Sequence, residues 1–130
     1  MNQVKNNKKS APKPNSGVVH KIDATGKVLG RLATEVSLKL RGKDLVGFQP
    51  HLESKSKVEV ANASKIIMSG KKLQQKSYRH HSGYPGGLKT KKLSEVFAKN
   101  PAEVLKKAIW NMLPKNKLRS KIIRNLKITN

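Results

Sequence analysis

The fold is decided by the stretch Val18-Val19-His20-Lys21-Ile22-Asp23-Ala24-Thr25-Gly26-Lys27-Val28-Leu29-Gly30-Arg31-Leu32-Ala33 (residues 18–33). The apolar residues at its start predict a short strand that ends at Asp23, followed by a turn at Thr25-Gly26 and a helix from near Lys27. At about 100° per residue, one side of this helix is apolar and the other is cationic. The apolar side carries Leu29, Leu32, Ala33, Val36 and Leu40, and the cationic side carries Lys27, Arg31 and Arg41.

Two later segments predict further strands, and so favour an α/β sheet over a helical bundle. Residues 57–61 alternate in polarity as a strand does, and Ile66-Ile67-Met68 forms a short apolar run before a turn at Ser69-Gly70. The next segment ends in Gly-Tyr-Pro-Gly-Gly (residues 83–87), which predicts a loop because it can sustain neither a helix nor strand pairing.

Helices are predicted after this loop. Ser94 can cap a short helix that ends near Lys99, because Pro101 disfavours helix at the residue before it. Asn100-Pro101-Ala102-Glu103 has the capping-box spacing and starts a second helix that Pro114 ends. The predicted apolar stripe of that helix is Leu105, Ala108, Ile109 and Met112, with Trp110 off the stripe, covering a neighbouring segment or stacking on RNA. Between residues 115 and 127, helical spacing relates Leu118, Ile122 and Leu126.

The charge of the chain requires a polyanionic partner. In 130 residues there are 29 Lys and Arg against 7 Asp and Glu, a formal charge of +22 that repels itself in a compact state. Residues 60–94 and 104–130 contain no acidic residue at all. Basic stretches separated by a nearly balanced segment predict several basic surfaces on one large polyanion.

The same composition argues against other classes of protein. With no Cys, few acids and no evident dyad, triad or ligand cluster, we expect no enzyme, cofactor or metal site. No apolar stretch approaches the roughly 20 residues of a membrane span. Residues 1–16 are polar and basic and predict a tail that cannot build a core, which leaves residues 17–130 as one lean domain with a mean hydropathy of −0.63.

Two segments are candidates for nucleic-acid contact. The loop from Tyr78 to Gly87 combines backbone amides with charged and flat side chains that suit RNA, the alternative being an ordinary turn with a buried Tyr84. The helix start at Lys27 and Arg31 can hold a phosphate, although no Walker loop closes there. The alternative at that helix is close packing at Gly30.

Several blocks of the sequence together resemble one known family. They are residues 22–34, Leu40-Arg41-Gly42-Lys43, Asn62-Ala63-Ser64-Lys65, Ser69-Gly70-Lys71-Lys72, residues 78–88 and Met112-Leu113-Pro114-Lys115-Asn116. In this order, over about residues 18–128, the chain resembles the family of the thirteenth protein of the large ribosomal subunit. The resemblance implies a compact three-layer α/β domain with a small, mostly parallel sheet, a basic N-terminal tail and a C-terminal extension.

The resemblance also implies a structural role in the large ribosomal subunit, with direct binding of its RNA early in assembly. The expected partners are large-subunit ribosomal RNA and neighbouring ribosomal proteins, without a membrane or self-association, on a cytoplasmic or an organellar ribosome. The runner-up is a nucleoid-type architectural protein. The predicted RNA-binding residues are Lys27, Arg31, Arg41, Lys43, Lys71, Lys72, Lys76, Tyr78, Arg79, His80, His81, Tyr84, Gly86, Gly87, Lys89, Lys115, Lys117, Arg119, Lys121 and Arg124.

Overall fold

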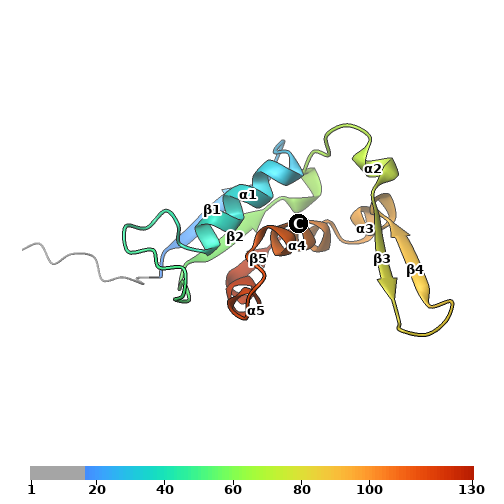
Figure 1. Cartoon of the computed structure of the whole chain (residues 1–130). Coiled ribbons are helices and arrows are strands. Elements are labelled where there is room, and N and C mark those ends of the chain that lie inside the picture. Colours follow the sequence, from blue (N-terminus) through green and yellow to red (C-terminus); the bar gives the residue numbers. More distant parts are fainter. Residues whose placement is uncertain (1–16) are drawn as a thin grey trace, which may run out of the picture.

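The computed structural model describes residues 17–130, and the tail predicted at residues 1–16 lies outside them. The elements of the first half are β1 (Val19–Asp23), α1 (Leu29–Leu40), β2 (Lys57–Ala61), the 3-10 turn η1 (Ala63–Lys65) and α2 (Lys72–Gln75). The second half contains β3 (Ser77–His81), β4 (Leu88–Lys92), α3 (Leu93–Lys99), α4 (Pro101–Met112), α5 (Leu118–Ile122), η2 (Ile123–Asn125) and β5 (Leu126–Ile128). Figure 1 shows a body built on β1, β2 and β5, from which β3 and β4 project at one end.

The body is organised by a three-stranded parallel sheet in the order β1-β2-β5. Ile22 of β1 lies beside Val60 of β2, which lies beside Ile128 of β5. Because side chains alternate across a strand, Ile22 and Val60 face the core and are buried, while Lys21 and Lys127 point to solvent. The α/β class and the small, mostly parallel sheet are thus confirmed.

Helix α1 forms the centre of the core. Its predicted apolar side is confirmed, because Leu29, Leu32, Ala33, Val36 and Leu40 are all buried. The helix packs against β2 and against α4, whose residues Leu105 and Ile109 are also fully buried. Full burial of a leucine contributes about 1.5–3 kcal/mol, so this contact supplies much of the stability of a lean core.

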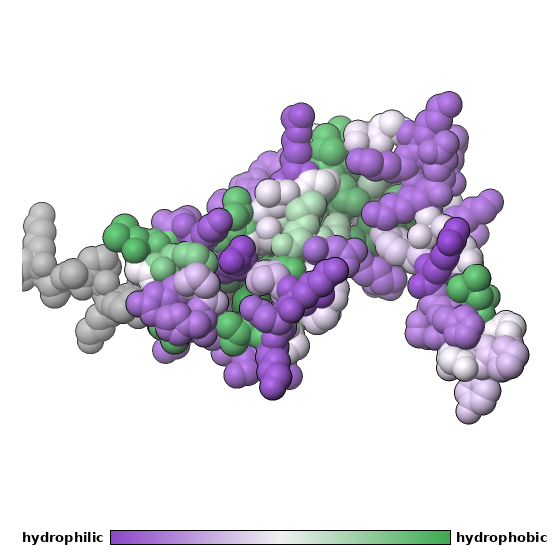
Figure 2. All heavy atoms as spheres, viewed as in Figure 1, coloured by the Kyte–Doolittle hydropathy of each residue, from purple (hydrophilic) through white to green (hydrophobic). Residues whose placement is uncertain are grey.

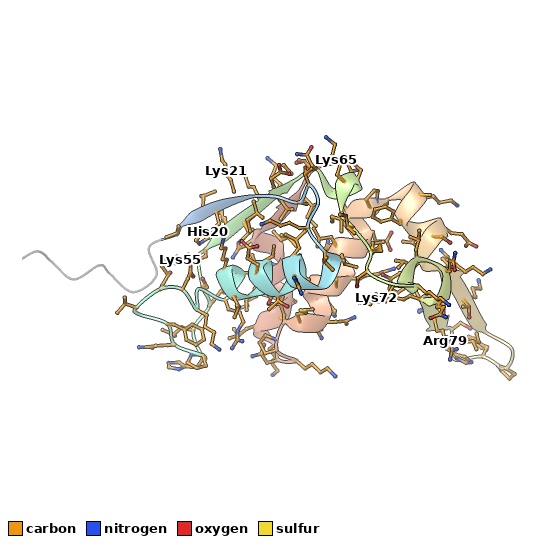
Figure 3. The ribbon with its side chains drawn as sticks, turned by 90° about the horizontal axis from the view of Figure 1, so that it is seen from above. His20, Lys21, Lys55, Lys65, Lys72 and Arg79 are labelled. Atoms are coloured by element: carbon orange, nitrogen blue, oxygen red, sulfur yellow. The ribbon has the colours of Figure 1, made fainter. Side chains whose placement is uncertain are left out.

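Helices α1 and α4 form a layer against the sheet. Because α1 contacts both the sheet and α4, these helices lie on one face of the sheet, and Figures 1 and 3 agree with this arrangement. On the other face, Val19, Lys21 and Lys57 are exposed. Over residues 17–130, α1 and α4 therefore cover one face of the sheet, and exposed side chains, most of them charged, line the other.

The start of α4 agrees with the capping residues predicted from the sequence, whereas the start of α3 does not. The Asn100 side chain accepts a hydrogen bond from the Glu103 amide at 3.3 Å, and α4 runs from Pro101 to Met112, before Pro114. The predicted cap at Ser94 is wrong, because α3 already begins at Leu93, directly after β4. The predicted stripe of α4 is partly wrong: Val104 is buried, whereas Met112 is 43% exposed.

Two strand assignments also differ from expectation. The run Ile66-Ile67-Met68 forms no strand of its own, and Ile67 makes a single parallel bridge to Val28. The helical spacing around Leu126 was misleading, because helix ends at Asn125 and Leu126–Ile128 forms β5. Pairing with β2, which is distant in sequence, overrides the local helical pattern there.

Asp23 fastens the ends of two neighbouring strands. Its Oδ1 accepts hydrogen bonds from the Asn62 side-chain amide at 3.0 Å, the Thr25 amide at 3.0 Å and the Thr25 hydroxyl at 2.8 Å. These bonds, that from Asn62 foremost, lower the pKa of Asp23 to about 2. The carboxylate thus holds the turn after β1 against the end of β2.

We predict that this link makes folding pH-dependent in the acid range. The pKa of Asp23 is lower in the folded chain, about 2, than the usual 3.8, so its contribution is complete above pH 4 and is lost as the pH falls toward 2. Thermal unfolding of the wild type and Asp23→Ala, measured from pH 5 to pH 2, should show a steeper acid loss of stability in the wild type. Parallel pH profiles would contradict this account of the turn.

Candidate nucleic-acid interface

The projecting element is a β-hairpin. The loop predicted from Tyr78 to Gly87 is therefore shorter than expected, because residues 78–81 pair antiparallel with β4, Arg79 opposite Thr90 and His80 opposite Lys89. Partners across a hairpin share a face, so Tyr78, His80 and Lys89 lie on one face, and Arg79 and Thr90 lie on the other. The exposed residues on both faces make the hairpin an arm with two accessible surfaces.

The arm is anchored to the body at its base. The ring of Tyr78 is partly buried against the core, and Lys107 Nζ of α4 lies 4.6 Å from the centre of the ring. Burial, with a smaller effect of Glu103, raises the pKa of the Tyr78 phenol. Leu93, immediately after β4, is fully buried, and its amide donates to the Lys76 carbonyl at 2.8 Å. Tyr78 therefore fixes the arm on the body.

The tip of the arm is a tight turn held by hydrogen bonds from its backbone amides. Gly83 and Gly86 have φ angles of +87° and +72°, which side chains rarely allow. The Gly83 amide donates to Nδ1 of His81 at 2.9 Å, and the Gly87 amide donates to the Tyr84 carbonyl at 3.0 Å. The side chain of Tyr84 is left 76% exposed, so the alternative that it fills the protein's own core is wrong.

Cationic side chains cover the arm without any acidic neighbour in sequence. Arg79 and Lys89 are exposed, as is the imidazole of His80, and residues 60–94 contain no Asp or Glu. Lys91 and Lys92 are exposed on β4 as well, although they are not among the predicted RNA-binding residues. Both lysines lie within the acid-free stretch of residues 60–94, and this stretch is the sequence feature that indicates them. In Figure 2, hydrophilic residues cover most of the visible face, including much of the arm.

The basic side chains in and beside α1 differ in whether they contact other side chains of the protein. Lys27 Nζ and Lys39 Nζ each lie 3.1 Å from a carboxylate oxygen of Glu35, and these bonds lower the pKa of Glu35. The guanidinium of Arg41 lies 5.6 Å from the centre of the Phe48 ring. Of the predicted residues here, Arg31 and Lys43 are exposed to solvent. Lys27 is therefore used partly to pair with Glu35.

The basic side chains near the C-terminus also differ in whether they contact other residues of the protein. Arg119 lies 4.3 Å from the centre of the Trp110 ring, and its Nε donates to the Trp110 carbonyl at 2.7 Å. Arg119 therefore covers the end of α4, which accounts for Trp110 without any RNA. Lys121 Nζ lies 3.9 Å from Glu53, a spacing at which an exposed pair contributes little. The remaining predicted residues, Lys115, Lys117 and Arg124, are exposed.

The predicted residues therefore form separate surfaces. The first is the arm with its approach, from Lys71, Lys72 and Lys76 to Lys89, beside which α1 begins. The others are the loop after α1 and the segment around α5. Figure 3 shows Lys72 and Arg79 on the side of the arm, away from Lys55 and His20. Across residues 17–130 no three His, Asp or Glu side chains are grouped as metal ligands. In the same range, no helix has the length and apolarity needed to cross a membrane.

We predict that Tyr84 and Arg79 act differently at the arm. Tyr84→Ala should leave the melting temperature of the free protein unchanged, because the ring is exposed. It should cost about 1–3 kcal/mol of binding to an RNA fragment, with the salt dependence unchanged. Arg79→Ala should reduce both affinity and salt dependence, because it removes a charge. A lower melting temperature with normal affinity for Tyr84→Ala would contradict the assignment.

Comparison with known proteins identifies the family of the chain. The family model "Ribosomal protein L13" matches residues 18–129. A protein of Clostridioides difficile (strain 630), named large ribosomal subunit protein uL13, is 51% identical over 107 residues, which cover 82% of this chain and 75% of the relative. Proteins of the same name from Chlorobium phaeobacteroides (50% identical, 82% and 71% covered) and Thermobifida fusca (49% identical, 84% and 73% covered) are similarly related. The chain belongs to the ribosomal protein L13 family.

Proposed function

We propose that this protein is a structural constituent of the large ribosomal subunit that binds the subunit's RNA directly and acts early in its assembly. The observation that carries the proposal is the exposed, acid-free arm of β3 and β4, presented by a protein with a net charge of +22. Membership of the L13 family, whose relatives are named as large-subunit proteins, supports the choice of ribosomal RNA over other polyanions.

The arm suits RNA better than a small anionic ligand. Its two exposed faces carry Arg79 on one side and Lys89 on the other, so it can lie between two RNA segments and contact phosphates on both. Arg79 can donate two parallel hydrogen bonds to a phosphate or a base edge. Tyr84 at the tip offers a flat face to an unpaired base.

Separate basic surfaces explain how a small protein would assist assembly. The arm, the loop after α1 that contains Lys43, and the residues around α5 lie on different parts of the molecule and would contact different RNA segments. Bringing several segments to one rigid body lowers the entropy cost of joining them to each other. Binding RNA also neutralises the repulsion among the protein's own cations, so RNA would stabilise the fold.

The experiment is sedimentation of the native protein from cell extract through a gradient after a high-salt wash. We expect it to travel with large subunits, and a chain with Arg79, Lys89, Lys91 and Lys92 all changed to Ala to be released at lower salt. A chain with Lys21, Lys55, Lys57 and Lys65 all changed to Ala loses the same number of charges from exposed positions of the body and is the matched control. Sedimentation with chromosomal DNA, or release to the top of the gradient at low salt, would contradict the proposal.

A further inference from the structure

A cavity of about 380 Å³ lies where the body meets the arm. Its wall is formed by the start of α1, the segment before α2, α2 itself, the start of α3 and the end of α4. Its size is in the range of sites that bind small molecules or single groups of larger ones. Figure 3 shows Lys72, one of its lining residues, between α1 and the arm.

Gly30 is the residue of this cavity whose identity the fold does not explain. It is the second residue of α1, with no left-handed φ angle, and a Cβ built on it would meet no atom within 4 Å. The alternative of close helix packing at Gly30 is therefore wrong. Glycine weakens a helix relative to alanine, so the chain carries an unfavourable residue at a point that faces the open space of the cavity.

The other residues that line the cavity are mostly of two kinds, basic and apolar. Lys72 and Lys76 are both exposed, and Lys72 Nζ lies 3.2 Å from the Ser69 hydroxyl, which also lines the cavity. No acidic residue contributes to the lining. The apolar part comes from Leu93, which is fully buried, and from Met68, Ala108 and Met112.

This combination suits one chemical group of RNA. A nucleotide has a flat base, which gains from apolar contact, and an anionic phosphate, which gains from paired lysines. Methionine side chains are flexible and polarisable and adapt to the face of a ring. Asn111, at the end of α4, adds a donor and an acceptor with which a base edge can form hydrogen bonds.

We propose that the cavity receives one unpaired nucleotide of the bound RNA, with its base against Met68, Ala108 and Met112 and its phosphate at Lys72 and Lys76. The absence of a side chain at Gly30 leaves room for that nucleotide. The inference rests on the proposed function, because it assumes that the RNA of the large subunit is the ligand. It adds an inserted nucleotide to the surface contacts of the arm.

The first test uses the free protein and needs no ribosomal RNA. Uridine 5′-monophosphate, titrated to millimolar concentration, should shift the backbone amide NMR signals of Gly30, Ser69 and Ala108. Inorganic phosphate should shift the signal of Ser69 and leave that of Ala108 unchanged, because phosphate lacks a base. Equal effects of the two probes, or no shift with either, would overturn the proposal.

The second test fills the cavity. Gly30→Leu should leave the melting temperature of the free protein equal or higher, because leucine favours helix and meets no clash at Cβ. Its affinity for large-subunit ribosomal RNA should fall by at least about fivefold, the lower range for losing one stacked base. Ala98→Leu adds the same side chain at an exposed position of α3 and is the matched control. Gly30→Ala should show a smaller loss in the same direction.

The outcomes separate this inference from the proposed function. Wild-type affinity in Gly30→Leu, with salt-dependent RNA binding intact, would overturn the inserted nucleotide and leave the ribosomal role standing. A wild-type protein that fails to bind large-subunit RNA would overturn both.

Discussion

The contact on which the rest of the structure depends is the apolar side of α1, which packs against β2 and α4 at once. With hydrophobic residues at 35% and aromatic residues at 4%, the chain has little apolar material, and most of it is gathered in this one core. The core fixes α4, and α4 in turn holds the arm, because Lys107 lies over the ring of Tyr78. The arm can therefore be exposed on both faces and still keep a defined direction.

The protein has far more basic than acidic residues, 29 against 7, and so carries a large positive charge. Most of its few acids already have partners: Glu35 pairs with Lys27 and Lys39, Glu103 with Lys107, Glu53 with Lys121, Glu59 with Lys127, and Asp44 lies beside His20. Exposed pairs of this kind contribute little to stability. None of these pairs involves a basic residue of β3 or β4, so the cations of the arm remain available to RNA.

The parts of the fold that were predictable are those with a local cause. The apolar side of α1 follows from residue spacing, and the start of α4 follows from Asn100 and Pro101, whose capping and steric effects act within one turn. Strands β3 and β5 were missed because their formation depends on pairing with residues elsewhere in the chain. A turn rich in glycine was correctly predicted near Gly83, but nothing local showed that strands flank it.

The candidate site was predictable to a similar degree. The charge run identified the segment that forms the arm, since acid-free stretches can be read directly from the sequence. The use of Arg119 to cover Trp110, and of Tyr78 as an anchor, could not be read because each contact joins different elements. The cavity beside Gly30 was equally hidden, because it is assembled from segments of four helices and a loop.

The central claim is that cations on these separate surfaces hold RNA through its phosphates. The most direct measurement is the affinity of the full chain for a domain-sized fragment of large-subunit ribosomal RNA as a function of salt. If about 6–10 phosphates are neutralised, affinity should fall by roughly 10³–10⁵ between about 50 and 200 mM salt. An affinity that changes by less than about tenfold over the same range would contradict the claim.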